Sequence, residues 1–309
     1  MPDFLVLAQI LWTGVATSSY AVLFSIAFAL VLKITRLWNF AQAGVMGIAF
    51  YAMYAAVNVF KWPTAAAVAF GVAVTIAVSV LLEIYGLRTL RARRSSSLTF
   101  FIFTLVCSEF AAYLLSLIFG TEPASLYPTI VSPVEIVLNV AVSRWDLTAV
   151  AVTLALLVAL YLFLRLARDG QFMLAVADNP ALAELYGIST KRAFLGALLI
   201  AAVLVCGGMY LYGSRSAVIP TTPLQLMLFA VIATLLGGMG NVFGAGAAAV
   251  VLALVQSYSV LVIPSAWQNL ILYAFLFVTI LFFPQGVQPR AWLRRLRARR
   301  LSSAAAKPA

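Results

Sequence analysis

Long apolar runs separated by short polar breaks fill almost the whole chain, and this pattern restricts what it can fold into. Eight or nine such runs lie between residues 5 and 283 of the 309, and a helix that crosses a bilayer needs about 20 apolar residues. Only 9% of the residues are charged, against roughly 25% in a soluble domain. We therefore predict an all-α, polytopic integral membrane protein with about eight or nine transmembrane helices. The expected spans are 7–32, 37–60, 63–83, 98–119, 147–165, 193–213, 223–239, 242–263 and 266–283.

Two of these regions are interrupted by residues that are unusual in a lipid-facing helix. Residues 37–60 and 223–263 contain Gly, Asn and Gln among their apolar residues. Non-helical backbone at membrane depth survives only where it faces protein or a water-filled cavity. Half-helices are therefore an alternative to full spans in both regions.

The basic residues are divided unequally between the two sides of this topology. The chain has a net charge of +11, and 17 of its 20 Lys and Arg fall on one side. Positive charge gathers in the cytoplasmic loops of membrane proteins, so the excess needs no nucleic-acid partner. We expect this side to be cytoplasmic and the N-terminus to lie outside, in a multi-pass protein of a bacterial inner membrane. The 17 are Lys33, Arg36, Arg88, Arg91, Arg93, Arg94, Arg165, Arg168, Lys191, Arg192 and seven from Arg290 onward, whereas Lys61, Arg144 and Arg215 fall on the other side.

The spans leave no room for a soluble domain of any size. We assign residues 1–289 to one transmembrane domain, with a cytoplasmic loop at about 168–192, and residues 290–309 to a basic cytoplasmic tail. The tail is either a solvated segment that sets the orientation of the chain or an amphipathic segment lying on anionic membrane lipid. The first residues lack the basic region of a cleavable signal peptide, so we expect the first span to be retained.

The composition excludes several kinds of catalytic site. There is no histidine, and both cysteines, Cys107 and Cys206, lie within expected spans, which excludes histidine-based triads and thiol or imidazole metal sites. A phosphate-binding P-loop needs a Lys directly after a Gly, and none of the four lysines has one. We expect no enzyme activity, no metal and no cofactor. Energy for active transport would then come from an ion gradient or from another polypeptide.

Glu109 is the one carboxylate expected near the middle of a span, while Glu83 lies near a span end. Ionisable groups inside membranes mark ion pathways by default, although they also pair structurally within bundles. Glu109 is therefore a candidate intramembrane polar site, and an ion-coupled secondary transporter is the alternative function that it favours. The acidic residues of the long external loop have no recognisable catalytic spacing and are expected to be solvated; they are Glu122, Glu135 and Asp146.

The cytoplasmic loop contains the signals of one short helix. Asp178 and Asn179 are good N-cap residues, and Pro180 suits the first helical position. Gly187 supplies the C-terminal stop. A helix of about two turns is too short to be stable alone in water, so another surface must hold it.

On this short helix Leu182, Leu185 and Tyr186 fall at positions i, i+3 and i+4, and form one apolar stripe. One interpretation is that the stripe lies in a groove of a partner protein and passes the partner's movement to the spans. The other is that it folds back on the protein's own helix ends. Spacing alone leaves both open.

The same loop resembles part of a known family. Residues 170–188, with AVADNPALAELYGIST at 175–190 followed by Lys191 and Arg192, are similar to the coupling loop of permeases in the high-affinity branched-chain amino acid importers, a family of ATP-binding-cassette transporters. In that family the loop docks on the ATPase subunit, which implies the same role here. The implied coupling helix comprises Asp178, Asn179, Ala181, Leu182, Glu184, Leu185 and Gly187.

Two glycine-containing segments also resemble motifs of that family. Residues 235–250, LLGGMGNVFGAGAAAV, contain Gly240 and Gly244 in the spacing of a GxxxG packing face. Residues 37–54 place a polar pair before two glycines. Gly-interrupted segments in two halves of a chain occur at transporter binding sites, whereas the alternative is that the glycines only pack helices. The candidates for the translocation pathway are Asn39, Gln42, Gly44, Gly47, Gly238, Gly240, Asn241 and Gly244.

The early motif departs from the family at one place. Relatives usually have His, Gly and an acidic residue there, and this chain has Gln42, Ala43, Gly44 and Val45. The loss of the imidazole and the acid puts a polar contact with the cargo in doubt. The run at 271–287, with its Pro, Gln and Gly near the end, restores the resemblance.

These resemblances imply a transmembrane permease subunit of an ATP-driven importer for branched-chain amino acids or similar small solutes. It would work with a second homologous permease subunit, two ATP-binding subunits and a periplasmic substrate-binding protein. Urea, short amides and small aromatic acids stay open as cargo, because specificity in such systems rests largely with the binding protein.

Overall fold

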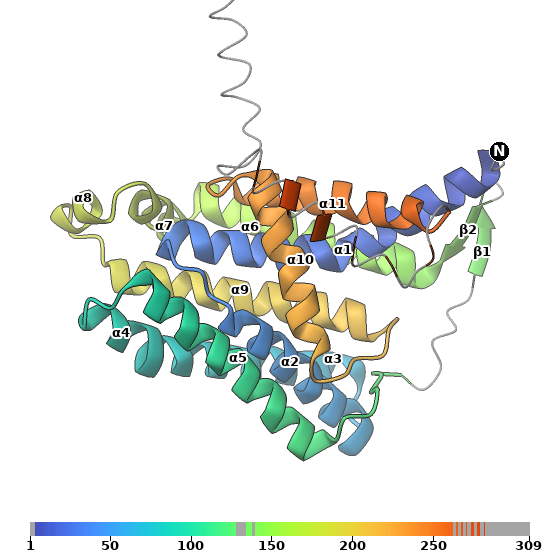
Figure 1. The fold of residues 1–309 in the computed structure, drawn as a ribbon, viewed down its shortest axis with the longest axis horizontal. Helices are drawn as coiled ribbons and strands as arrows, with labels where there is room; N and C mark the ends of the chain where they lie inside the picture. Colours follow the sequence, from blue (N-terminus) through green and yellow to red (C-terminus); the bar gives the residue numbers. More distant parts are fainter. Residues whose placement is uncertain are drawn as a thin grey trace, which may run out of the picture.

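The protein is an elongated bundle of helices with one small hairpin (Figure 1). A computed structural model describes residues 4–127, 134–137 and 140–261, with isolated positions between 264 and 281. Within the described residues, seven helical segments are long and apolar enough to cross a membrane, which confirms the all-α membrane class. They contain α1 (Phe4–Thr35), α2 (Ala41–Tyr54) with a π-helical end (Ala55–Val59), α3 (Thr64–Leu81), which continues through a π-helical turn (Leu82–Leu87) into α4 (Arg88–Ala92), α5 (Ser97–Phe119), α6 (Arg144–Leu166), α9 (Thr190–Gly213) and α11 (Val242–Ser259).

An eighth apolar helix, α10 (Thr222–Gly237), is shorter than a full span. It corresponds to the expected span at 223–239, for which a half-helix was one alternative. The ninth expected span at 266–283, the run at 271–287 and the basic tail at 290–309 lie outside the continuously described residues.

The centre of the bundle is α1. It contacts α6, α7, α9, α10 and α11, and 83% of its most apolar stretch is buried, against 22% for α3, α5 and α6. A helix that is apolar on all sides can be surrounded by other helices or by lipid, and the fully buried Phe24 and Phe28 show that α1 is surrounded by other helices. The peripheral helices each bury one side only.

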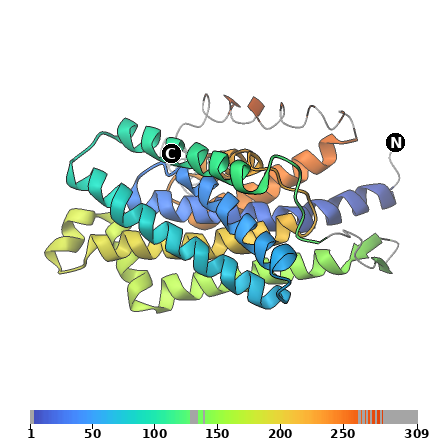
Figure 2. The same cartoon turned by 90° about the horizontal axis from the view of Figure 1, so that it is seen from below.

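The bundle has two chemically different ends. One end, on the left in Figures 1 and 2, holds α4 and the short helices α7 (Arg168–Asp178) and α8 (Pro180–Leu185). The other holds the start of α1 and the antiparallel hairpin of β1 (Val134–Val137) and β2 (Val140–Ser143). We call the first end the basic end, because the ten described basic residues that the sequence assigned to one side lie in or just after α4, in α7, or at the adjoining ends of α1, α6 and α9. Lys61, Arg144 and Arg215 belong to the second, which we call the hairpin end.

The interruptions expected at 37–60 and 223–263 are present. After α1 the backbone turns at Arg36, which has a φ of 55°, and runs without helix to Phe40 before α2 begins. Between α10 and α11 the chain turns at Gly238, with a φ of 93°, a value that L side chains rarely adopt. The Asn241 side chain then caps α11 by accepting from the backbone N–H of Gly244 at 3.1 Å.

Candidate functional site

The predicted short helix is present at the basic end as α8. The Asn179 side chain caps it by accepting from the backbone N–H of Leu182 at 3.1 Å. Pro180 is its first residue, and Gly187 ends it with a φ of 79°. Of the two candidate caps, Asp178 is instead the last residue of α7. The capping signals in the sequence therefore located this helix to within a residue at each end.

The stripe on α8 points away from the protein. Leu185 and Tyr186 are 84% and 78% exposed, and Leu182 is also exposed, while Ala183 on the opposite side of α8 is buried. The stripe therefore does not fold back on the protein's own helix ends in the described structure. Asp178, Asn179, Ala181, Glu184 and Gly187 are exposed as well, so all seven residues of the implied coupling helix are exposed.

Two polar contacts fix α8 to its neighbours. The hydroxyl of Thr190, the first residue of α9, donates to Oε1 of Glu184 at 2.7 Å. On the other side, Nη2 of Arg36 donates to the backbone oxygens of Ala177 and Asp178 at 3.0 and 2.9 Å. A guanidinium at a helix C-terminus satisfies carbonyls that lack an intrahelical partner and interacts favourably with the helix dipole. The end of α7, one residue before α8 begins, is thus tied to the residue that follows α1.

Helix α7 was not predicted from the sequence, in which residues 168–192 were expected to form a loop with one short helix. This helix packs on the end of α6 through Gly170, where an added Cβ would lie only 2.2 Å from the backbone oxygen of Phe163. Met173, Val176 and Ala177 form its buried side. Their spacing of three and four residues was the signal that would have identified the helix.

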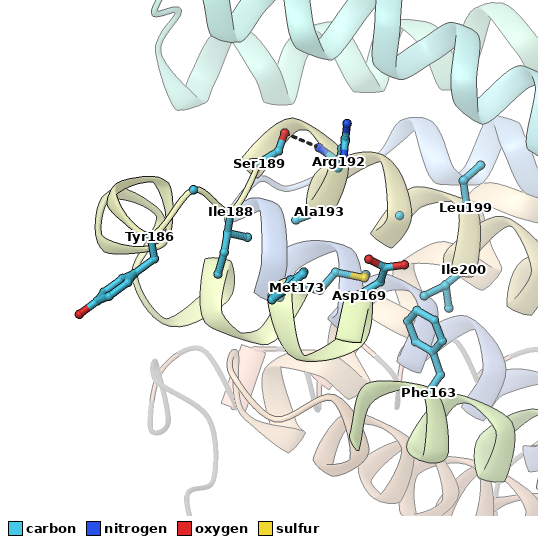
Figure 3. A pocket seen from close by; sticks show the side chains of 13 residues that line it. Phe163, Asp169, Met173, Tyr186, Ile188, Ser189, Arg192, Ala193, Leu199 and Ile200 are labelled. Carbon is cyan, nitrogen blue, oxygen red and sulfur yellow. Dashed lines mark hydrogen bonds between the residues drawn. The ribbon is translucent and has the colours of Figure 1, made fainter. Parts of the chain in front are cut away.

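A cavity of about 870 Å³ lies behind α8 at the basic end. Figure 3 shows Met173 and Asp169 reaching into it from α7, with Phe163 from α6 and Ile200 from α9. Tyr186 at its margin points away from these side chains. The cavity lies between α7, the end of α6 and the start of α9, with the turn after α8 at its margin, and α8 projects from the basic end (Figure 1).

The early pathway candidates lie between α2 and α5. A Cβ on Gly44 would meet Cβ of Ala111 at 2.9 Å, and a Cβ on Gly47 would meet Cδ1 of Leu115 at 3.0 Å. These two glycines therefore pack α2 closely against α5. Beside them is a cavity of about 50 Å³, which Glu109 of α5 also lines. The structure thus brings the candidate intramembrane acid next to two of the predicted pathway glycines.

Asn39 and Gln42 are buried, with 2% and 4% of their surfaces exposed. Among the described residues, Oδ1 of Asn39 and both polar side-chain atoms of Gln42 have no hydrogen-bond partner. An unsatisfied buried polar atom is unfavourable and calls for an explanation such as water or a functional role. The residues stay pathway candidates on this ground.

The late glycine run lies elsewhere. Pro223 at the start of α10 is near Gly47, whereas Gly238 follows the other end of α10, about 22 Å away at 1.5 Å per helical residue. The two glycine segments therefore do not meet at one point of this subunit.

The predicted packing pair of Gly240 and Gly244 is wrong. A Cβ on Gly240 would meet nothing within 4 Å, because this residue sits in the turn between α10 and α11. The close approach is made instead by Gly237, whose Cβ would lie 2.3 Å from the backbone carbon of Gly244. A GxxxG spacing places two glycines on one side only within a continuous helix. The positive φ of Gly238 interrupts the helix before Gly240, so Gly240 and Gly244 do not share a helix.

Asp146, which was expected to be solvated, is 95% buried at the hairpin end. Its carboxylate accepts from Nε1 of Trp12 at 3.2 Å, from Nη1 of Arg215 at 3.1 Å and from the backbone N–H of Ser143 at 3.1 Å. It is the third residue of α6 and completes a capping box with Ser143. The pairing with Arg215, 69 residues away, was not visible in the sequence.

Comparison with known proteins identifies the family. The family model described as "Branched-chain amino acid transport system / permease component" matches residues 10–281. The high-affinity branched-chain amino acid transport system permease protein LivH of Salmonella typhimurium is 27% identical over 93% of this chain and 97% of its own, and LivH of Escherichia coli K12 is 26% identical over the same shares. BraD of Pseudomonas aeruginosa, with the same description, is 24% identical over 94% and 98%.

Among solved structures, PsaBC from Streptococcus pneumoniae in complex with Fab is similar with a TM-score of 0.49 and 11% identity, over 87% of this chain and 91% of that chain. The family match covers the loop at 168–192 and both glycine segments. The chain therefore belongs to the branched-chain amino acid transport permease family and is a permease component of a transport system.

Proposed function

We propose that this permease forms half of the membrane pathway of an ATP-driven importer for branched-chain amino acids or similar small solutes, and that α8 is the element on which an ATP-binding subunit docks. The exposed stripe of Leu182, Leu185 and Tyr186 carries the proposal. Three large apolar side chains on a projecting helix need a partner surface, and a helix laid in a groove is a common way to supply one.

The proposed assembly contains a second homologous permease subunit, two ATP-binding subunits and a periplasmic substrate-binding protein. The basic end would face the cytoplasm, in accordance with the positive-inside rule, and the hairpin end would face the periplasm and the binding protein. ATP hydrolysis would take place on the separate subunits, since none of the four lysines of this chain follows a glycine as a P-loop requires.

Movement of the ATP-binding subunits would reach the spans through the contacts at the base of α8. The hydroxyl of Thr190 connects Glu184 to α9, and Arg36 connects the end of α7 to α1. Both connections are short and polar, so a displaced α8 would pull on two spans at once.

The proposal is tested by changing Leu185 to Asp in the assembled importer. A charge at the centre of an apolar contact should abolish binding of the ATP-binding subunits, which is measured by co-purification. Ile136→Asp is the matched control, because Ile136 is also a largely exposed apolar residue but lies on β1 at the hairpin end. Co-purification that is equal in the two variants would contradict docking through α8.

The ion-coupled alternative makes a different prediction. The purified permease alone, reconstituted into vesicles, would accumulate solute in response to a proton or sodium gradient, and Glu109→Gln would remove the gradient dependence. The importer proposed above should show neither behaviour and should require ATP and its partner subunits.

A further inference from the structure

Glu109 lies near the middle of α5 on the exposed side of that helix, and in a spanning helix of this length that position falls near the middle of the bilayer. It is about 18 Å from the start of α5 at Ser97 and about 15 Å from its end at Phe119. The side chain is exposed, and the residues around it on the same side of α5 are large and apolar. They are Val106, Phe110, Tyr113 and Leu117.

Within residues 4–127, 134–137 and 140–261, Glu109 is the only exposed charged side chain near the middle of a span. Glu83 is buried and paired with Arg91 near the basic end. The exposed sides of α3 and α6 have no charge at this depth, and they suit contact with lipid. In both views α5 lies at the margin of the bundle (Figures 1 and 2).

A carboxylate cannot comfortably face lipid at this depth. A charged side chain at the bilayer centre shifts the insertion equilibrium by about a hundredfold or more, and such groups almost always face the bundle interior or a water-filled cavity. The side of α5 around Glu109 must therefore be covered by protein or water in the working assembly. The second permease subunit of the proposed function is the occupant that can cover a whole spanning helix and leave water between the subunits.

The surroundings of the carboxylate suit an amine with an apolar side chain. Glu109 lines the cavity of about 50 Å³ that also borders Gly44 and Gly47, and it has no hydrogen-bond or ion-pair partner among the described residues. A carboxylate beside apolar residues gains most from a charge-assisted hydrogen bond with a cation. An ammonium group supplies that bond, and Phe110 and Tyr113 supply apolar surface beside it.

We propose that the side of α5 around Glu109 lines the translocation pathway against the second permease subunit, and that the Glu109 carboxylate binds the ammonium group of the amino acid in transit. This inference rests on the proposed function and adds the contact that selects amine-bearing cargo inside the membrane. It also assigns to Glu109 a role that needs no coupling ion.

The first test measures access of water to this position in the assembled importer. With Cys107 and Cys206 changed to Ala, Glu109→Cys should react with a membrane-impermeant, cationic thiosulfonate at least about tenfold faster than Leu154→Cys, because the reagent attacks thiolates, which form in water. Leu154 is the matched control, since it is exposed on α6 and is also about 15 Å from the hairpin end. Equal, slow labelling of both positions would overturn the inference.

The second test concerns the ammonium group. In the same background, leucine should slow the labelling of Val106→Cys, one helical turn from the intact Glu109, whereas 4-methylpentanoate, which has the same side chain but no ammonium group, should not. Adding Glu109→Gln should weaken protection by leucine about tenfold or more, the loss expected for one charge-assisted hydrogen bond. Equal protection with and without Glu109→Gln would overturn the ammonium contact.

The outcomes separate this inference from the proposed function. If the importer assembles with its ATP-binding subunits and pumps leucine while Glu109→Cys is inert, only the inference fails. If no ATP-binding subunit binds through Leu185, the proposed function fails whatever the labelling shows.

Discussion

Gly170 sets how closely α7 lies on α6, and changing it to Ala is a direct test of whether that position matters for transport. The added Cβ would lie 2.2 Å from the backbone oxygen of Phe163 and 2.8 Å from Cα of Leu164. Both neighbours are backbone atoms and cannot turn aside. To reach even 3.0 Å, α7 must move by 0.8 Å, and α8 must move with it because only Asn179 separates the two helices.

The size of the effect follows from the cost of overpacking. Such a clash typically costs about 1–3 kcal/mol, which corresponds to a 5- to 150-fold shift away from the arrangement in which α7 is seated on α6. Gly196→Ala on α9 is the control, since its Cβ would meet only the flexible Met173 side chain at 3.3 Å. Both substitutions gain the same helix propensity, about 1 kcal/mol, so the difference between them isolates the clash.

The assay is cargo uptake by the reconstituted importer, together with hydrogen exchange in α7. Gly170→Ala should lower the uptake rate at least about fivefold relative to Gly196→Ala and should speed amide exchange in α7. An uptake rate for Gly170→Ala that equals that of the control would refute the reasoning that the packing of α7 on α6 positions α8 for transport.

Three further outcomes can be checked on the same material. Gly237→Ala should impair uptake, because its Cβ would meet the backbone of α11 at 2.3 Å. Gly240→Ala should transport normally, because there is open space around that position. Equal uptake by the two variants would contradict the close packing of α10 on α11. Asp146→Asn should lower the free energy of unfolding by about 1–3 kcal/mol and so lower the thermal unfolding midpoint. Arg144→Gln breaks only an exposed ion pair and should lower the free energy of unfolding by less than about 1 kcal/mol. A larger drop in midpoint for Arg144→Gln than for Asp146→Asn would contradict the structural role of the buried Asp146. Asn179→Ala should remove a cap worth about 1 kcal/mol and speed hydrogen exchange in α8 severalfold, and unchanged exchange there would show that the cap does not hold the helix.

The spans and their order were predictable because their signal is local. Scarce charge and runs of about 20 apolar residues located seven described spans, and the polar interruptions indicated where α2 and α10 would be irregular. The α8 helix was predictable for the same reason, since Asn179, Pro180 and Gly187 act within a few residues of one another.

What the sequence did not reveal depends on contacts between distant segments. The burial of Asp146 depends on Arg215 and Trp12, which come from two other elements. The packing role of Gly237 depends on where the backbone turns at Gly238, which a spacing rule for a continuous helix cannot anticipate. The placement of Glu109 on the outer side of α5 required the whole bundle, because α5 is apolar on nearly all sides in its sequence.

The two hydrogen bonds from Arg36 to the end of α7 link any movement of α8 to α1. They fasten the segment that bears α8 to α1, the spine that five other helices touch. A displacement of α8 would therefore move α1 together with the helices that pack on it, instead of bending one helix alone. If the proposed function holds, alternating access would then be a rigid-body rotation of this subunit against the second permease subunit.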